Sequence, residues 1–207
     1  MAANHFGAVL AGGKSRRFGS TKALAELGGQ SILDRVIGAH LAAGLTVFVV
    51  ADREDRFPGC KVPVIGDEVS GSGPIGGLHA ALRHAHERGG AGVCVTGCDT
   101  PFVEKGVLEA LVEASRGNDA VVIFDERRDS AQPLIGWYST RLFGGVESAI
   151  ADHDLAMNRF LSRIPKLRFL HTSELRLARP VDTVFLNVNR PADLDVAREY
   201  LELHPDS

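Results

Sequence analysis

Short hydrophobic runs alternate with amphipathic segments of helix length along almost the whole chain. The strand-sized runs are rich in β-branched residues, and the segments between them carry apolar residues at helical spacing, as Ile32, Leu33, Val36 and Ile37 do. This order is typical of βαβ units and predicts an α/β fold with a mainly parallel sheet. We expect strands at 6–10, 46–51, 62–65, 92–96, 120–124, 133–138, 167–170 and 183–186, and helices at 32–41, 75–87, 107–115, 141–151 and 192–203.

Length and composition exclude several classes of protein. With 207 residues, 44% of them hydrophobic, and no linker or repeat, the chain is expected to form a single domain over residues 1–207. A formal charge of −3 argues against a basic face for nucleic acid. No window approaches the roughly 18 apolar residues of a membrane span, and residues 1–5 lack the cationic start of a signal peptide. We therefore expect a cytoplasmic protein that binds neither nucleic acid nor membranes, with Cys60, Cys94 and Cys98 as reduced thiols.

Glycines gather in three of the loops that follow predicted strands. In a parallel sheet these loops all leave from the carboxyl edge, where open α/β sheets bind ligands, so we expect them to converge. Tight βα turns alone would also favour glycine, but would not require so many. The glycines concerned are Gly12, Gly13 and Gly19 after the first strand, Gly66, Gly71, Gly73, Gly76 and Gly77 after the third, and Gly97 after the fourth.

The loop at 10–22 has the composition of a polyphosphate cradle. Two glycines are followed by four cations, Lys14, Arg16, Arg17 and Lys22. Glycine lets backbone N–H groups approach phosphate oxygens, and the cations neutralise their charge. The loop is not a P-loop, because Ala8 stands where that motif needs glycine, and it lacks the second glycine of the dinucleotide fingerprint.

Four segments, in order along the chain, resemble the motifs of nucleotidylyltransferases that act on the molybdenum cofactor. The match is closest to the molybdenum cofactor guanylyltransferase family, which attaches GMP from GTP to molybdopterin. The resemblance implies a Rossmann-like three-layer sandwich, in agreement with the order of elements, and implies GTP, molybdopterin and Mg2+ as ligands. The segments are 10–22, with Phe18 in place of the family's methionine, 73–78 (GPIGGL), 97–101 (GCDTP) and 187–194 (NVNRPADL).

Asp99 and Lys22 are the strongest candidates for catalytic residues. Asp99 follows the strand at 92–96, where a carboxylate facing phosphates would repel them unless it holds a cation such as Mg2+. A helix N-cap role would place it several residues too early. The resemblance gives Asp99 the metal and Lys22 a phosphate contact, and a fixed cation suits the charge that develops on departing pyrophosphate. Of the adjacent Arg16 and Arg17, one is expected to face phosphate, and we take Arg16 as the third catalytic candidate.

Weaker signals mark the remaining binding residues. By resemblance Asp67 contacts the nucleotide, although turn chemistry alone would also favour an aspartate after Gly66. Asn187 and Asn189 are expected either to orient the acceptor or the metal, or only to cap the last helix. Backbone groups of Leu10, Ala11, Gly12 and Gly13 are expected to reach the base and the phosphates.

The acceptor side departs most from the family. Relatives tend to carry adjacent arginines after the helix at 141–151, whereas this chain has Leu155, Ala156 and Met157, with Arg159 and Arg163 as the nearest cations. A cytidylyltransferase of the same pathway and a sugar-phosphate nucleotidylyltransferase are alternatives, although Gly12 favours the guanylyl branch, because the cytidylyl branch tends to have alanine there. Outside the enzymes, the alternative is a nucleotide-binding scaffold for molybdoenzyme maturation. Proteins of that maturation are expected as docking partners in either case.

Overall fold

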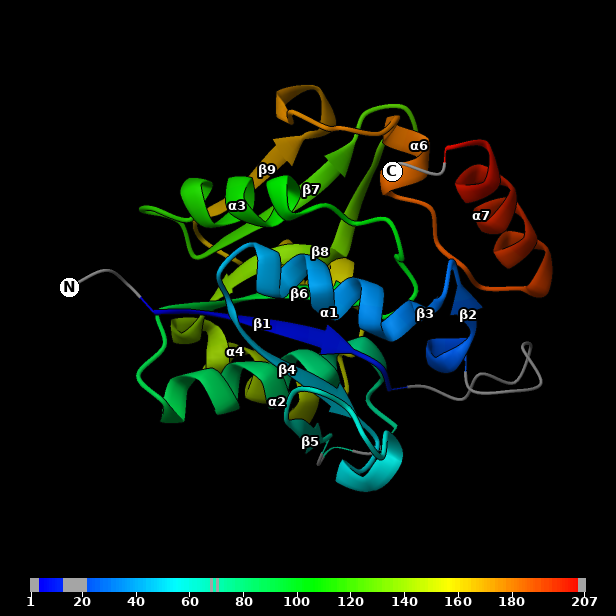
Figure 1. Ribbon diagram of the computed structural model, residues 1–207. Coiled ribbons are helices and arrows are strands. Elements are labelled where there is room, and N and C mark those ends of the chain that lie inside the picture. The colour runs from blue at the N-terminus through cyan, green and yellow to red at the C-terminus, as the bar shows by residue number, and fades with distance from the viewer. Residues whose placement is uncertain (1–3, 13–21, 68, 70, 205–207) are drawn as a thin grey trace.

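A seven-stranded sheet runs through the middle of the molecule in the order β5-β4-β1-β6-β8-β7-β9 (Figure 1). The computed structural model describes residues 4–12, 22–67, 69 and 71–204. Strand β8 is antiparallel to both of its neighbours, and all other neighbouring pairs are parallel, so the prediction of a mainly parallel sheet is confirmed. The strands are β1 (His5–Leu10), β4 (Thr46–Ala51), β5 (Val64–Gly66), β6 (Gly92–Gly97), β7 (Ala120–Asp125), β8 (Ser130–Ser139) and β9 (Leu167–His171).

Helices cover both faces of this sheet, which gives the three-layer sandwich that the resemblance implied. Helices α1 (Ile32–Ala42) and α3 (Lys105–Ala114) pack on one face, and lie above β1 in Figure 1. Helices α2 (Gly73–Glu87), α4 (Phe143–Ala151) and α5 (Met157–Leu161) pack on the other. The central strands are buried on both faces, and this explains why they are continuously hydrophobic in the sequence.

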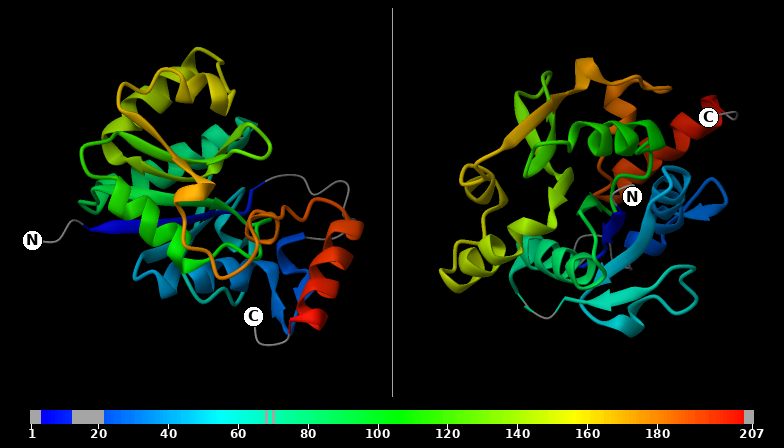
Figure 2. Two further views of the ribbon diagram at one scale, coloured as in Figure 1. Left: turned by 90° about the horizontal axis from the view of Figure 1, so that it is seen from above. Right: turned by 90° about the vertical axis from the view of Figure 1, so that its left-hand side faces the viewer.

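A smaller apolar cluster joins the two ends of the chain. Strands β2 (Glu26–Leu27) and β3 (Gln30–Ser31) form a hairpin, and its turn residues Gly28 and Gly29 have φ of +60° and +76°, as two-residue hairpin turns require. Helix α7 (Pro191–Leu203) lies beside this hairpin in both views of Figure 2. The buried residues between them are Leu27, Ile32, Phe102, Val188, Leu194 and Ala197.

The predicted strand at 183–186 is wrong. The segment begins with a short helix, α6 (Val181–Val184), and Val184 and the following Phe185 are buried in the core on the α1 and α3 side. A short apolar run is compatible with both a strand and a buried helical turn, and periodicity cannot distinguish them. The hairpin β2–β3 and helix α5 were not expected from the sequence either. No helix in the described part of the chain is long and apolar enough to cross a membrane.

Candidate functional site

Lys22, Asp99 and Asn189 meet at the carboxyl edge of the sheet, although 77 and 167 residues of chain separate Lys22 from the other two. The Lys22 ammonium donates to Asp99 Oδ2 and to Asn189 Oδ1, each at 3.1 Å. The Lys22 and Asp99 side chains are only 15% and 24% exposed. The structure therefore brings together a cation, a carboxylate and an amide oxygen, with the charged pair partly shielded from water.

The end of β6 fixes the position of Asp99. A Cβ atom on Gly97 would lie 2.4 Å from Asp99 Oδ1, so the carboxylate can fold back over the strand only because residue 97 is glycine. The backbone on either side is tied down, since Cys98 N–H donates to the Leu10 carbonyl at 3.0 Å and Val188 N–H donates to the Asp99 carbonyl at 2.8 Å. Asp99 is thus held between β1 and the segment that leads into α7.

Asn189 is positioned by the start of α7. The Asp193 carboxylate accepts hydrogen bonds from the backbone N–H groups of Asn189, at 2.7 Å, and Arg190, at 2.8 Å. Such an acidic residue in the first turn satisfies N–H groups that have no partner within the helix. Asn187, two residues earlier, does not join the cluster, because its amide donates to the Phe185 carbonyl at 3.3 Å.

The loops after β1 and β5 leave from the same edge. Ala11 N–H donates to the Val50 carbonyl at 2.8 Å, and Asp67 N–H donates to the Ala51 carbonyl at 2.6 Å, so both loops border the end of β4. Gly12 is exposed, with open space around the position of a Cβ. The convergence expected from the glycines is therefore present for the described parts of these loops. Gly13, Arg16 and Arg17 lie outside the described residues.

Asp67 lies against the first turn of α2. Its carboxylate accepts from the Val69 N–H at 3.0 Å, and a Cβ on Gly76 would lie 3.0 Å from Asp67 Oδ2. Partial burial raises the pKa of the Asp67 carboxyl, against the opposing effects of the Val69 N–H and of His79. Glycine at 76 leaves room for this carboxylate beside the helix.

Comparison with known proteins identifies the family. Residues 7–167 match the model of the MobA-like NTP transferase domain. The chain belongs to the MobA-like NTP transferases. A protein of Pelotomaculum thermopropionicum described as a probable molybdenum cofactor guanylyltransferase is 31% identical over 196 residues, which cover 95% of this chain and 93% of that protein.

Solved structures agree with this assignment. The molybdopterin-guanine dinucleotide biosynthesis protein A of Archaeoglobus fulgidus superposes with a TM-score of 0.79 at 28% identity, over 95% of this chain and 98% of that one. The Rv0371c protein of Mycobacterium tuberculosis H37Rv, solved in complex with manganese, shares the fold at 20% identity, with a TM-score of 0.61 over 96% of this chain and 100% of that one. The chain is thus a nucleotidyltransferase with an α/β fold, as the sequence predicted.

The thiol beside Asp99 is not a nucleophile in this NTP transferase. Burial, together with the neighbouring Asp99 charge, raises the pKa of Cys98 to about 12. Because the thiolate is the reactive form, Cys98 is inert at neutral pH. Its backbone N–H links β6 to β1.

Two charged residues that the sequence analysis did not select also lie at this edge of the NTP transferase. Asp52 follows β4 directly, and Arg56 Nη1 donates to its Oδ2 at 2.6 Å. The place of Asp52 at the end of a predicted strand was a usable signal, since Asp67 and Asp99 were selected on the same ground.

The cations expected on the acceptor side are already paired. Arg159 and Arg163 both donate to the Asp154 carboxylate, at 2.5 Å from Arg159 Nε, and this holds the pKa of Asp154 below its usual range. Neither arginine is therefore a free anion ligand in this conformation. Asp154 was not recognised from the sequence as their partner.

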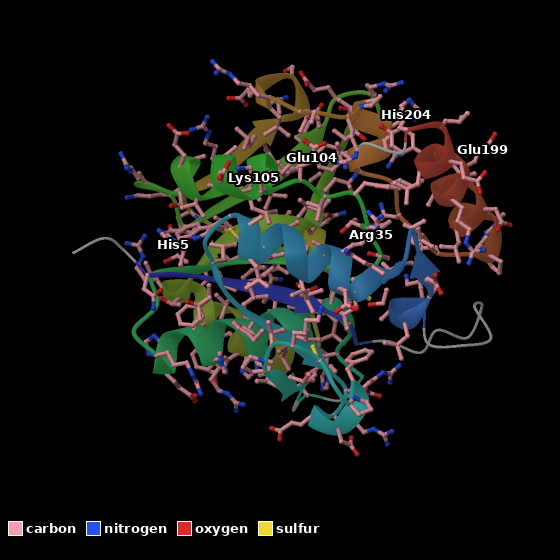
Figure 3. The ribbon with its side chains drawn as sticks, in the orientation of Figure 1. His5, Arg35, Glu104, Lys105, Glu199 and His204 are labelled. Atoms are coloured by element: carbon pink, nitrogen blue, oxygen red, sulfur yellow. The ribbon has the colours of Figure 1, made fainter. Side chains whose placement is uncertain are left out.

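A groove of about 940 Å³ lies at the opposite end of the sheet. Its lining includes His5, Trp137 and Arg141, and Figure 3 shows His5 at the start of β1, far from the β2–β3 hairpin. The candidate site of this NTP transferase is therefore a different surface, formed by the strand ends that carry Asp67 and Asp99.

Proposed function

We propose that this nucleotidyltransferase transfers GMP from GTP to the terminal phosphate of molybdopterin, releasing pyrophosphate and forming molybdopterin guanine dinucleotide. The observation that carries the proposal is the cluster of Lys22, Asp99 and Asn189 beside the glycine-rich strand ends. The descriptions of the relative from Pelotomaculum thermopropionicum and of the structure from Archaeoglobus fulgidus support molybdopterin as the acceptor and guanine as the nucleobase. The proposal takes residues 1–207 as one catalytic domain.

The reaction needs positioning and charge neutralisation more than proton transfer. An oxygen of the acceptor phosphate forms a bond to the α-phosphorus of GTP, and the bond from that phosphorus to the oxygen bridging to the β-phosphate breaks. Pyrophosphate leaves with the electron pair of that bond. Because the attacking phosphate is already ionised at neutral pH, no general base is required. Lys22, held in place by Asp99 and Asn189, provides a fixed positive charge for the departing pyrophosphate.

The donor set of the site fits a divalent metal. One Asp99 oxygen accepts from Lys22, and within the described residues the other, Oδ1, has no hydrogen-bond partner. Asn189 adds an amide oxygen, and the described residues contain no group of three or more His, Cys, Asp or Glu that could hold an ion by themselves. Mg2+ is typically bound in this way, by one or two carboxylates with phosphate oxygens completing its shell. When bound, it would neutralise and orient the triphosphate, with Asp99 as its protein ligand.

The remaining residues take their roles from the family resemblance and their places at the edge. Leu10, Ala11, Gly12 and Gly13 would contact the nucleotide with backbone groups, and Asp67 would approach it from the end of β5. Arg16 would face the phosphates. The amide of Asn187 supports the backbone of its own loop, so Asn189 is the asparagine we assign to the site. A cytoplasmic location and docking to maturation proteins stay predictions from the sequence.

A nucleotide titration tests the choice of base. We expect calorimetry with GTP, CTP, ATP and UTP in the presence of Mg2+ to give the tightest binding for GTP. A site matched to guanine leaves polar groups unpaired with another base, at about 1–3 kcal/mol for each. Tighter binding of CTP would move the assignment to the cytidylyl branch. Loss of all binding on removal of Mg2+, with recovery on its return, is the expected control.

A further inference from the structure

Strand β8, which lies on the side of β6 away from β1, contains a bulge. Gly136 pairs with Val122 of β7, but the next pair along is Gln132 with Ile123. Pro133, Leu134 and Ile135 therefore all fall between two successive residues of β7. Pro133 has no N–H to give to the sheet, and proline is typical of such bulges.

The hydroxyl of Tyr138 holds this bulge. It donates to the Pro133 carbonyl at 2.6 Å, and the Tyr138 side chain is completely buried. The ring passes over Gly136, two residues away on the same face, where a Cβ would lie 3.3 Å from Tyr138 Cε2 and 2.9 Å from the Val121 carbonyl oxygen. Because residue 136 is glycine, the Tyr138 ring can pass over it and its hydroxyl can reach the bulge.

The bulge lies next to the strand that carries Asp99. Ile135 pairs with Thr96 of β6, and because β8 runs antiparallel, Leu134 and Pro133 continue toward the carboxyl edge, where Asp99 follows. Both of these bulge residues are partly exposed. Strands β1, β4 and β5 lie on the other side of β6 in the sheet. The bulge is therefore the neighbour of Asp99 on the side of β6 away from β1, β4 and β5.

The in-line geometry of the reaction places the acceptor on the β8 side of Asp99. In phosphoryl-transfer reactions the attacking and leaving oxygens stand roughly in line, on opposite sides of the phosphorus. In the proposed function the backbone at the end of β1 contacts the phosphates, so pyrophosphate leaves on that side and the acceptor phosphate approaches from the opposite, β8 side. This step rests on the proposed function.

We propose that Tyr138 is a positioning residue for the acceptor substrate. By holding the Pro133 carbonyl, its hydroxyl fixes the bulge as the wall against which the acceptor binds. The partly exposed Pro133 and Leu134 present an apolar surface, which suits a phosphate monoester whose remaining part has an apolar or aromatic face. Tyr138 itself touches no substrate.

The variant Tyr138→Phe tests this assignment, because it keeps the ring and removes the hydroxyl. We expect the KM for molybdopterin to rise about fivefold, the usual effect of one hydrogen bond, with the KM for GTP within twofold of the wild type. Tyr200→Phe is the matched control, since Tyr200 is the second of the two tyrosines and packs against Phe102 in the α7 cluster. It is expected to change neither KM.

Loss of stability alone does not support the proposal, because any buried tyrosine could cause it. Equal rises in both KM values, or unchanged KM values in a folded Tyr138→Phe protein, would overturn it. Leu134→Ala provides a second test that leaves the buried hydroxyl intact, and it too should raise only the acceptor KM. If molybdopterin supports no pyrophosphate release but glucose 1-phosphate does, the proposed function fails. The same comparison of KM values is then made with glucose 1-phosphate, and decides the role of Tyr138 separately.

Discussion

His40 should make the stability of this protein fall steeply as the solution becomes acidic. Its side chain on α1 is completely buried, and its Nε2 lies 2.8 Å from Thr96 Oγ1 on β6. Among the described residues its Nδ1 has no hydrogen-bond partner, and it faces Gly7, where a Cβ would lie 2.4 Å away. Burial lowers the pKa of His40 from 6.5 to about 3, so the imidazole stays neutral in the folded state.

The sign of the effect follows from the two pKa values. The unfolded chain takes up a proton at His40 as the pH falls through 6.5, whereas the folded protein does so only near 3. The stabilisation is therefore fully present above the unfolded pKa and is lost as the pH falls toward the folded pKa. Between pH 7 and pH 5 the loss amounts to about 2 kcal/mol, with a limiting slope of about 1.4 kcal/mol per pH unit.

Urea denaturation of the wild type and of His40→Gln at pH 7, 6 and 5 measures this loss. Glutamine keeps a polar group near Thr96 but does not titrate, so the wild type should lose about 2 kcal/mol more than the variant over this range. His5 and His84, whose pKa values burial also lowers, titrate in both proteins and cancel in the difference. His86→Gln, at an exposed position of α2, is the control and should follow the wild type.

Parallel stability curves for wild type and His40→Gln would refute the argument. If the variant does not fold, the imidazole resonances of His40 in the wild type provide the same answer. They should keep their neutral positions down to about pH 4, and titration near pH 6.5 in the folded protein would contradict the assigned burial effect.

Three further substitutions test the site. Asp99→Ala should lower the rate of pyrophosphate release about a thousandfold or more, because losing a metal ligand costs several kcal/mol in the transition state. Its circular dichroism spectrum should stay that of the wild type. Activity within threefold of the wild type would remove Asp99 from the site. Lys22→Ala should lower kcat more than it raises the KM for GTP, and a change in KM alone would mean that Lys22 only holds the substrate. Gly97→Ala should lower kcat at least tenfold, since its Cβ would lie 2.4 Å from Asp99 Oδ1, and unchanged kcat would show that the carboxylate can move without loss.

The strands that the sequence predicted best are those buried on both faces. Val9 packs on the α1 and α3 side of β1 and Ala8 on the α2 side, so this strand is hydrophobic throughout and its bounds were predicted within one residue. The direction of β8 could not be read in the same way. The direction of β8 depends on the turn at 126–129 that joins it to β7, in which Asp129 adopts φ of +48°. The apolar pattern of the strand itself does not determine it.

The candidate site was predictable as far as it lies directly at strand ends. Asp99 and Asp67 follow strands with clear patterns, and the resemblance added Lys22. The choice between Asn187 and Asn189 was not predictable, because it depends on how Asp193 caps α7 and turns the preceding backbone. Pairing of side chains distant in the sequence leaves no periodic signal.

The central claim is tested most directly by the product of the reaction. Purified protein incubated with GTP, Mg2+ and molybdopterin should release pyrophosphate and form, in equal amount, a molybdopterin carrying GMP, identified by its mass. CTP in place of GTP, and glucose 1-phosphate in place of molybdopterin, should give far less product. Faster turnover with CTP, or turnover with glucose 1-phosphate and none with molybdopterin, would contradict the account.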